Sequence, residues 1–173
     1  MMRKLKFCHR LRCGGFVWIV CQLLFLAEPI LLAQKLQLSS VSARRGDQVT
    51  IELSLESRAG SEPLALQWDA KFPAAQMTLV DDKVLIGSTA RDAGKSLNCA
   101  VRDRTAASYT CRCILAGAQK PIPAGVIATF RLTIDRKAKI GSTSVRVEQG
   151  IAVSKDLKQV LLEPVETSVA IHK

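Results

Sequence analysis

Histidine and aromatic residues are scarce in this sequence of 173 residues. The histidines are His9, in an N-terminal segment with the pattern of a targeting signal, and His172, near the last residue. The sequence therefore offers no Ser/His/Asp or Cys/His system for nucleophilic catalysis. Asp81 and Asp82 are adjacent, but adjacent side chains of a strand or turn point apart, which does not favour the facing carboxylates of a glycosidase. We expect no enzyme.

Motifs for nucleotides and metals are also missing. The sequence has no Walker loop, EF-hand loop or glycine-rich dinucleotide turn. We therefore expect no cofactor.

The net charge is +10, and residues 34–173 keep 20 Lys and Arg against 14 Asp and Glu, a net charge of +6. The cations are interspersed with acids, and this part of the chain has four aromatic residues: Trp68, Phe72, Tyr109 and Phe130. A positive groove with a stacking platform is not visible in this pattern, so we expect no nucleic acid as a partner.

Residues 1–33 are predicted to be a signal peptide. A basic start is followed by the apolar run from Gly14 to Leu26, which is too short to span a bilayer alone, and cleavage is expected after Ala33. The alternative is an uncleaved N-terminal anchor, because residues 29–33 extend the apolar run. Residues 34–173 then form one exported domain, which would be periplasmic, on the cell surface or extracellular, with no membrane span.

Residues 34–173 are predicted to form an all-β domain. In residues 125–134, GVIATFRLTI, apolar residues alternate with polar ones except at Ile127, as in a strand with one buried face. Residues 48–57 and 64–72 show the same alternation. About nine such segments, spaced near ten residues and separated by turn residues, predict a two-sheet antiparallel sandwich. Trp68 has the parity of Leu66 and Phe72, so we expect it in the core and not as a ring that stacks on sugars.

The tripeptide Arg45-Gly46-Asp47 matches a cell-adhesion motif. It lies between two predicted strands, and Gly-Asp is common in turns. We interpret it as a turn.

Three cysteines follow residue 33: Cys99, Cys111 and Cys113. They could be thiolate ligands of a zinc ion. Zinc usually takes four ligands, however, and the histidine of residues 34–173 is His172, near the last residue, so we expect no metal. A hairpin turning near residues 104–107 would bring the three sulfur atoms together. In an exported protein this favours one disulfide, joining Cys99 with Cys111 or with Cys113.

Three stretches together resemble a cohesin domain, the bacterial β-sandwich module that binds dockerins in polysaccharide-degrading assemblies. They are VSARRGDQVTIELSLES (41–57), LALQWDAKFPAAQMTLV (64–80) and GVIATFRLTI (125–134), and the last is similar to the family's strand of the form G-V-[FI]-A-x-[IF]. The segment 150–171 resembles the closing hairpin, so the resemblance covers residues 35–172.

The resemblance implies a nine-stranded jelly roll without catalytic activity that binds a dockerin across one sheet face. The matching outward positions are Ala65, Gln67, Asp69, Arg102, Arg112 and Ile114, with Arg131 on a neighbouring strand. The sequence departs from the family at one point: Ala65 and Gln67 stand where the well-studied type carries an Asn and an Asp that bond the dockerin. The resemblance therefore implies the sandwich more directly than it implies recognition of an ordinary dockerin.

The sequence is compatible with three functions. In the first, Ile114 ringed by Arg102 and Arg112 binds a protein partner, either dockerin-like or an acidic helix; a solvated sheet face with one exposed isoleucine is the alternative interpretation of these residues. In the second, the sandwich binds carbohydrate, as a partner or through a link to polysaccharide degradation. In the third, it is a structural domain of the envelope.

Overall fold

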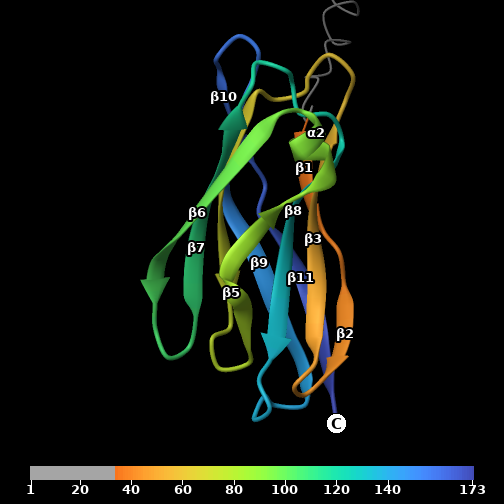
Figure 1. Ribbon diagram of the computed structural model, residues 1–173, viewed down its shortest axis with the longest axis vertical. Helices are drawn as coiled ribbons and strands as arrows, with labels where there is room; N and C mark the ends of the chain where they lie inside the picture. Colours follow the sequence, from red (N-terminus) through yellow and green to blue (C-terminus); the bar gives the residue numbers. More distant parts are fainter. Residues whose placement is uncertain (1–33) are drawn as a thin grey trace, which may run out of the picture. The chain divides into compact units, whose positions relative to one another are not determined.

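A computed structural model describes residues 34–173, which form a sandwich of two β-sheets (Figure 1). The predicted signal peptide, residues 1–33, lies outside the described residues. The described elements are β1 (Gln34–Leu38), β2 (Val41–Arg44), β3 (Gln48–Ser57), β4 (Ala65–Phe72), β5 (Met77–Ile86), α2 (Ser88–Asp92), β6 (Lys95–Arg104), β7 (Tyr109–Gly117), β8 (Gly125–Ile134), β9 (Gly141–Val153), β10 (Gln159–Leu162) and β11 (Val165–His172).

The smaller sheet has the strand order β1-β3-β8-β5, and the larger has the order β2-β11-β9-β4-β7-β6 with β10 also paired to β9. The described part of the chain therefore has eleven strands where the sequence predicts about nine. One reason is that the chain leaves the smaller sheet after Leu38 and enters the larger sheet at Val41. A further difference is that β2 pairs with β11 in parallel, whereas all the other pairs are antiparallel.

The core lies between the sheets, and the predicted alternation is confirmed. Trp68 and Phe72 of β4 and Phe130 of β8 are fully buried. Phe72 packs against Phe130 edge to face, with ring centroids 5.5 Å apart. The exception in the pattern of β8, Ile127, is the extra residue of a β-bulge opposite β3, so Ile127 and its neighbour Ala128 are both buried.

The Arg45-Gly46-Asp47 segment is a turn, as predicted. It connects β2 of the larger sheet to β3 of the smaller sheet. The Asp47 carboxylate accepts a hydrogen bond from the Arg44 amide at 2.8 Å, and Gly46 has a φ of 86° that favours glycine. The turn is thus the point where the chain crosses between layers.

The one helix among the described residues, α2, has five residues and packs against β8. No helix of residues 34–173 is long and apolar enough to cross a membrane.

Tyr109 of β7 connects the two layers by a buried hydrogen bond, since its hydroxyl oxygen accepts the backbone N–H of Leu79 on β5 at 2.9 Å. Burial raises the pKa of Tyr109, so its phenol stays neutral while the domain is folded. We predict that Tyr109→Phe lowers the free energy of unfolding by about 1–2 kcal/mol, because the Leu79 amide then loses its partner. Urea unfolding of the two proteins measures this difference, and equal midpoints would show that the bond contributes nothing.

Candidate functional site

The six residues selected from the sequence lie together on the outer face of the larger sheet. Ala65, Gln67 and Asp69 are on β4, Arg112 and Ile114 on the adjacent β7, and Arg102 on β6 at the edge of the sheet. On β4 and β7 their parity is opposite to that of buried Leu66, Trp68, Cys113 and Leu115, which places them outward, and Arg102 borders the same depression as Arg112 and Ile114. We call this surface, from β10 through β9, β4 and β7 to β6, the outer face.

Arg131 does not belong to it. The sequence comparison with cohesins placed Arg131 on a strand next to the others, but β8 is in the smaller sheet. Arg131 instead lies near Asp81, with 3.7 Å between its guanidinium and the carboxylate.

A row of side chains crosses the outer face at one level. Gln67 pairs with Ile114 of β7 on one side and with Ile151 of β9 on the other. Ile114 continues to Asn98 on β6, and Ile151 continues to Leu161 on β10. Because directly paired residues project to the same side of a sheet, this row places Leu161, Ile151 and Ile114 on one surface with Gln67 between them.

The apolar part of this row is exposed. Leu161 is 79% exposed and Ile114 46%, while Ile151 is partly buried. Sequence reasoning selected Ile114 but missed Ile151 and Leu161. The signal in the sequence was the apolar segment Val160–Leu162. Which of its side chains face outward depends on how β10 pairs with β9. That docking needs Gly150 on β9, since a Cβ atom there would lie 2.9 Å from the Cβ of Leu162.

Arg112 is held in place on the outer face. Its Nε and Nη2 atoms donate to the two carboxylate oxygens of Asp69 at 2.6 and 2.7 Å, and Nη2 also donates to Oε1 of Gln149 at 2.8 Å. Asp69 itself is only 6% exposed. The hydrogen bonds to Asp69, together with its negative charge, raise the pKa of Arg112. Asp69 and Arg112, taken from the sequence as two contact residues, therefore form one ion pair that covers the middle of the sheet.

Gln149 owes its position to a bulge in β9. It has a φ of 52° and lies where the register of β4 and β9 shifts opposite Trp68. A bulge redirects side chains, and here the Gln149 amide reaches Arg112.

The Arg112 pair is expected to stabilise the fold. We predict that Arg112→Ala lowers the free energy of unfolding by about 2 kcal/mol, because it leaves the Asp69 carboxylate without its charged partner. Arg102→Ala is the matched control and should change stability by less than about 0.5 kcal/mol. Denaturant unfolding of both variants tests this, and similar losses would contradict a structural role for the pair.

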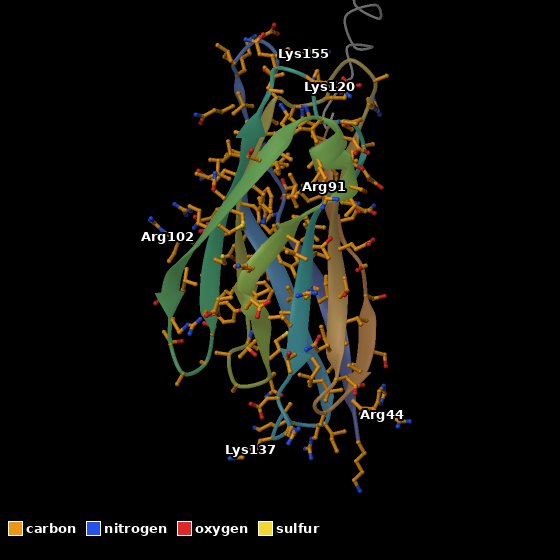
Figure 2. All side chains as sticks on the ribbon, in the orientation of Figure 1. Arg44, Arg91, Arg102, Lys120, Lys137 and Lys155 are labelled. Carbon is orange, nitrogen blue, oxygen red and sulfur yellow. A yellow bond between two sulfur atoms is a disulfide. The ribbon has the colours of Figure 1, made fainter. Side chains whose placement is uncertain are left out.

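Arg102 is a free cation of the outer face. It is exposed, it lies at a register shift between β6 and β7, and it has no ion pair within residues 34–173. Figure 2 shows its side chain extending away from the sandwich. Together with Ala100 and Ile114 it borders a shallow depression of ≈ 230 Å³.

Solved structures resemble the fold that carries this face. The cohesin–dockerin complex Coh-OlpA-Doc918 of Clostridium thermocellum contains a chain with a TM-score of 0.66, 15% identity, and coverage of 82% of this chain and 100% of that one. The fold is that of a cohesin. A cohesin module from a family 33 glycoside hydrolase of Clostridium perfringens has a TM-score of 0.64 at 12% identity, covering 81% of this chain and 97% of that one.

The similarity extends to a non-cellulosomal cohesin from the archaeon Archaeoglobus fulgidus, with a TM-score of 0.60, 10% identity, and coverage of 82% and 93% of the two chains. No family model matches the sequence, and no curated protein matches it. At these identities the likeness concerns the cohesin-like fold.

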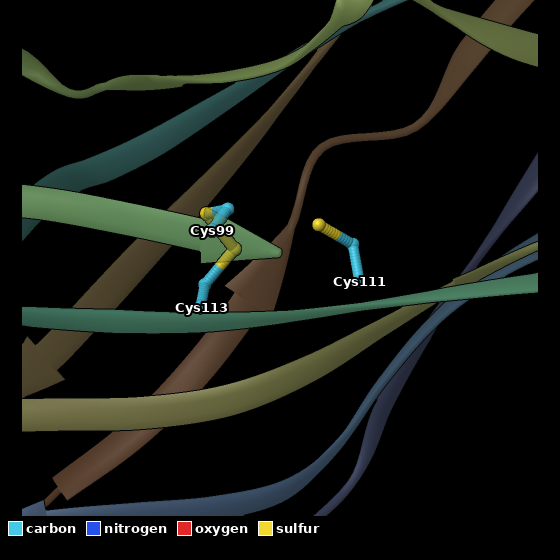
Figure 3. A group of neighbouring side chains, drawn as sticks. All are labelled: Cys99, Cys111 and Cys113. Atoms are coloured by element: carbon cyan, nitrogen blue, oxygen red, sulfur yellow. A yellow bond between two sulfur atoms is a disulfide. The ribbon is translucent and has the colours of Figure 1, made fainter. Parts of the chain in front are cut away.

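Cys99 and Cys113 form a disulfide in this cohesin-like domain. They are directly paired on β6 and β7, with a Cα–Cα distance of 4.1 Å, and Cys111 is free and buried (Figure 3). The three Sγ atoms lie within 4.8 Å of one another. The structure thus selects one of the two predicted pairings. The disulfide lies on the inner side of the sheet and fixes the strands that carry Arg102, Arg112 and Ile114.

Aromatic rings are not available to a ligand on the described part of the cohesin-like domain. Trp68, Phe72, Tyr109 and Phe130 are the aromatic residues of positions 34–173, and each is at most 3% exposed. Trp68 is therefore a core residue, as predicted. Sugar binding by ring stacking has no platform among these residues.

Proposed function

We propose that this protein is an exported binding module that holds a helical segment of a partner protein on its outer face. The observation that carries this proposal is the apolar row Leu161–Ile151–Ile114, which has its residues on three strands and is interrupted by one uncharged residue, Gln67, on a fourth. Exposed apolar residues that lie together on a rigid sheet are typical of an interaction site. The disulfide and the N-terminal sequence pattern support an extracytoplasmic location.

The partner is expected to be dockerin-like in its mode of binding. The similarity in fold to a chain of the cohesin–dockerin complex from Clostridium thermocellum supports this expectation. The composition of the face supports a partner helix that presents apolar side chains to Leu161 and Ile114, with an acidic residue near the free guanidinium of Arg102. Since the Arg112 charge is already matched by Asp69, shape and apolar contact contribute more than charge.

The role is non-catalytic in this proposal. The face carries the ion pairs Asp69–Arg112 and Arg146–Glu148, the free cations Arg102 and Lys71, and apolar side chains, and neither histidine nor thiolate lies on these described strands. Binding is therefore what the arrangement can do chemically.

Capture of a defined partner tests this proposal. The immobilised protein is exposed to the exported proteins of the producing cells, and bound chains are identified by mass spectrometry. Ile114→Asp removes the apolar centre, and Ile140→Asp is its control, because Ile140 is similarly exposed (50% against 46%) but lies in the loop between β8 and β9. We expect a partner with a dockerin-like module that is retained by the wild type and by Ile140→Asp and is lost with Ile114→Asp.

Two results would contradict this proposal. A partner that both variants retain would place binding away from the outer face. Retention of the domain on insoluble polysaccharide, unchanged by Ile114→Asp, would favour a carbohydrate-binding function instead.

A further inference from the structure

One end of the sandwich carries an excess of positive charge on two loops. Arg44 and Arg45 lie at the turn between β2 and β3, and Arg136, Lys137 and Lys139 lie between β8 and β9. All five side chains are exposed. Figure 2 shows Arg44 and Lys137 at the same end of the domain, the end opposite Lys120 and Lys155. We call these five residues the basic end.

The acidic residues of these loops do not neutralise the basic end. They are Asp47 and Asp135, and the carboxylate of each is used within its own loop: Asp47 accepts the amide of Arg44, and Asp135 accepts the amide of Lys137 at 2.6 Å. Within residues 34–173, none of the five cations forms an ion pair. Five cations and two acids leave an excess of +3 on two short loops.

The two loops are joined by hydrogen bonds. The amide of Gly46 donates to the carbonyl of Ile134 at 3.0 Å, and the amide of Ile134 donates to the carbonyl of Asp47 at 2.9 Å. Nε of Arg45 donates to the carbonyl of Ala138 at 2.7 Å, which leaves its Nη atoms free for a ligand. The cations are therefore held on an ordered backbone, so less entropy is lost when they bind an anion.

The surroundings of the basic end favour a charged polymer over other anionic partners. Its exposed large apolar residue is Ile140, so it lacks the apolar centre of a protein interface and the wedge of several apolar side chains that inserts into lipid. Every aromatic residue of positions 34–173 is buried, so bases have nothing to stack on. A polysaccharide with regularly spaced anionic groups can be bound by cationic side chains alone and needs neither an apolar centre nor aromatic rings.

We propose that the basic end binds an anionic polysaccharide. The guanidinium groups of Arg44, Arg45 and Arg136 would each hold an acid group of the polymer by paired hydrogen bonds, while Lys137 and Lys139 add charge without fixed geometry. This site is separate from the outer face, and it does not depend on the proposed function. A protein with both sites would attach a partner to an acidic polymer.

Isothermal titration at low ionic strength tests the proposal with polygalacturonate as the probe and neutral dextran as the uncharged comparison. The test variant carries Arg136→Glu, Lys137→Glu and Lys139→Glu. Its matched control carries Lys120→Glu, Lys155→Glu and Lys158→Glu, which change the net charge equally at other exposed positions. Thermal unfolding of both variants verifies that they are folded.

We expect binding to polygalacturonate, none to dextran, and a weakening of at least about tenfold in the test variant against less than about threefold in the control. Binding should also fall as salt is added. Equal weakening in both variants would overturn a localised site. Tighter binding to single-stranded DNA or to vesicles containing phosphatidylglycerol than to polygalacturonate would overturn the choice of partner. Ile114→Asp should leave polygalacturonate binding unchanged, which separates this proposal from that for the outer face.

Discussion

Phe130→Ala is expected to lower the free energy of unfolding by about 3–5 kcal/mol, because it removes a large side chain from the centre of the core. Phe130 is fully buried between the two sheets and meets Phe72 edge to face. Phe72 in turn stacks on Tyr109, with ring centroids 5.0 Å apart. Neither neighbouring ring can fill the space without leaving its own contacts, so most of the cavity should remain.

Urea unfolding measures this loss, with Arg131→Ala as the control on the adjacent position of β8. Arg131 is exposed, and its ion pair with Asp81 is long and solvated, so its removal should change stability by less than about 0.5 kcal/mol. A loss below about 1 kcal/mol for Phe130→Ala would mean that the ring does not lie between the layers.

Removal of the disulfide has the second largest expected effect. The double variant Cys99→Ala/Cys113→Ala should lose about 3 kcal/mol, the value that the chain-entropy model gives for a closed loop of about 15 residues. The bridge joins residues 14 positions apart on β6 and β7. Because β6 is at the edge of the sheet and pairs with β7 alone, the loss should appear first as faster hydrogen exchange in β6.

Cys111 supplies the control for this experiment. Its thiol is buried, and burial raises its pKa, with Asp69 acting in the same direction. Since the thiolate is the reactive form, Cys111 should be alkylated only after denaturation. Cys111→Ala should cost less stability than the double variant. A peptide map with Cys99 joined to Cys111 would contradict the structure.

The alternation of side chains in β3, β4 and β8 could be predicted from the sequence because it is a local property. A two-residue period fixes which side chains face the core, and the burial of Trp68 and Phe130 follows from it. The turn at Gly46 could be predicted for the same reason. The positions of the six outward residues came from these periods together with the resemblance to cohesins.

The remaining features depend on contacts between distant segments. The ion pair of Asp69 and Arg112 needs the register of β4 against β7, and the contribution of Gln149 needs a bulge that forms only when β9 docks beside β4. Likewise, Arg131 lies in the other sheet because of the strand order, and the alternation of apolar and polar residues within a strand does not indicate strand order. The apolar row was only partly found because β10 reaches the outer face through its pairing with β9.

The structure also changes which substitutions are informative. Arg112 could be taken from the sequence as a free contact residue, but its role in covering Asp69 means that Arg112→Glu would disturb the sheet itself. Ile114, Leu161 and Arg102 are better probes, because none of them is buried.

The central claim is that the outer face holds the partner, and the dissociation constant for the captured partner tests it most directly. Isothermal titration compares the wild type, Ile114→Asp and Ile140→Asp at equal salt. We predict that Ile114→Asp weakens binding by at least about a hundredfold, as expected for an apolar centre converted to a buried charge, whereas Ile140→Asp changes it by less than about twofold. Equal affinities for all three proteins would contradict the claim.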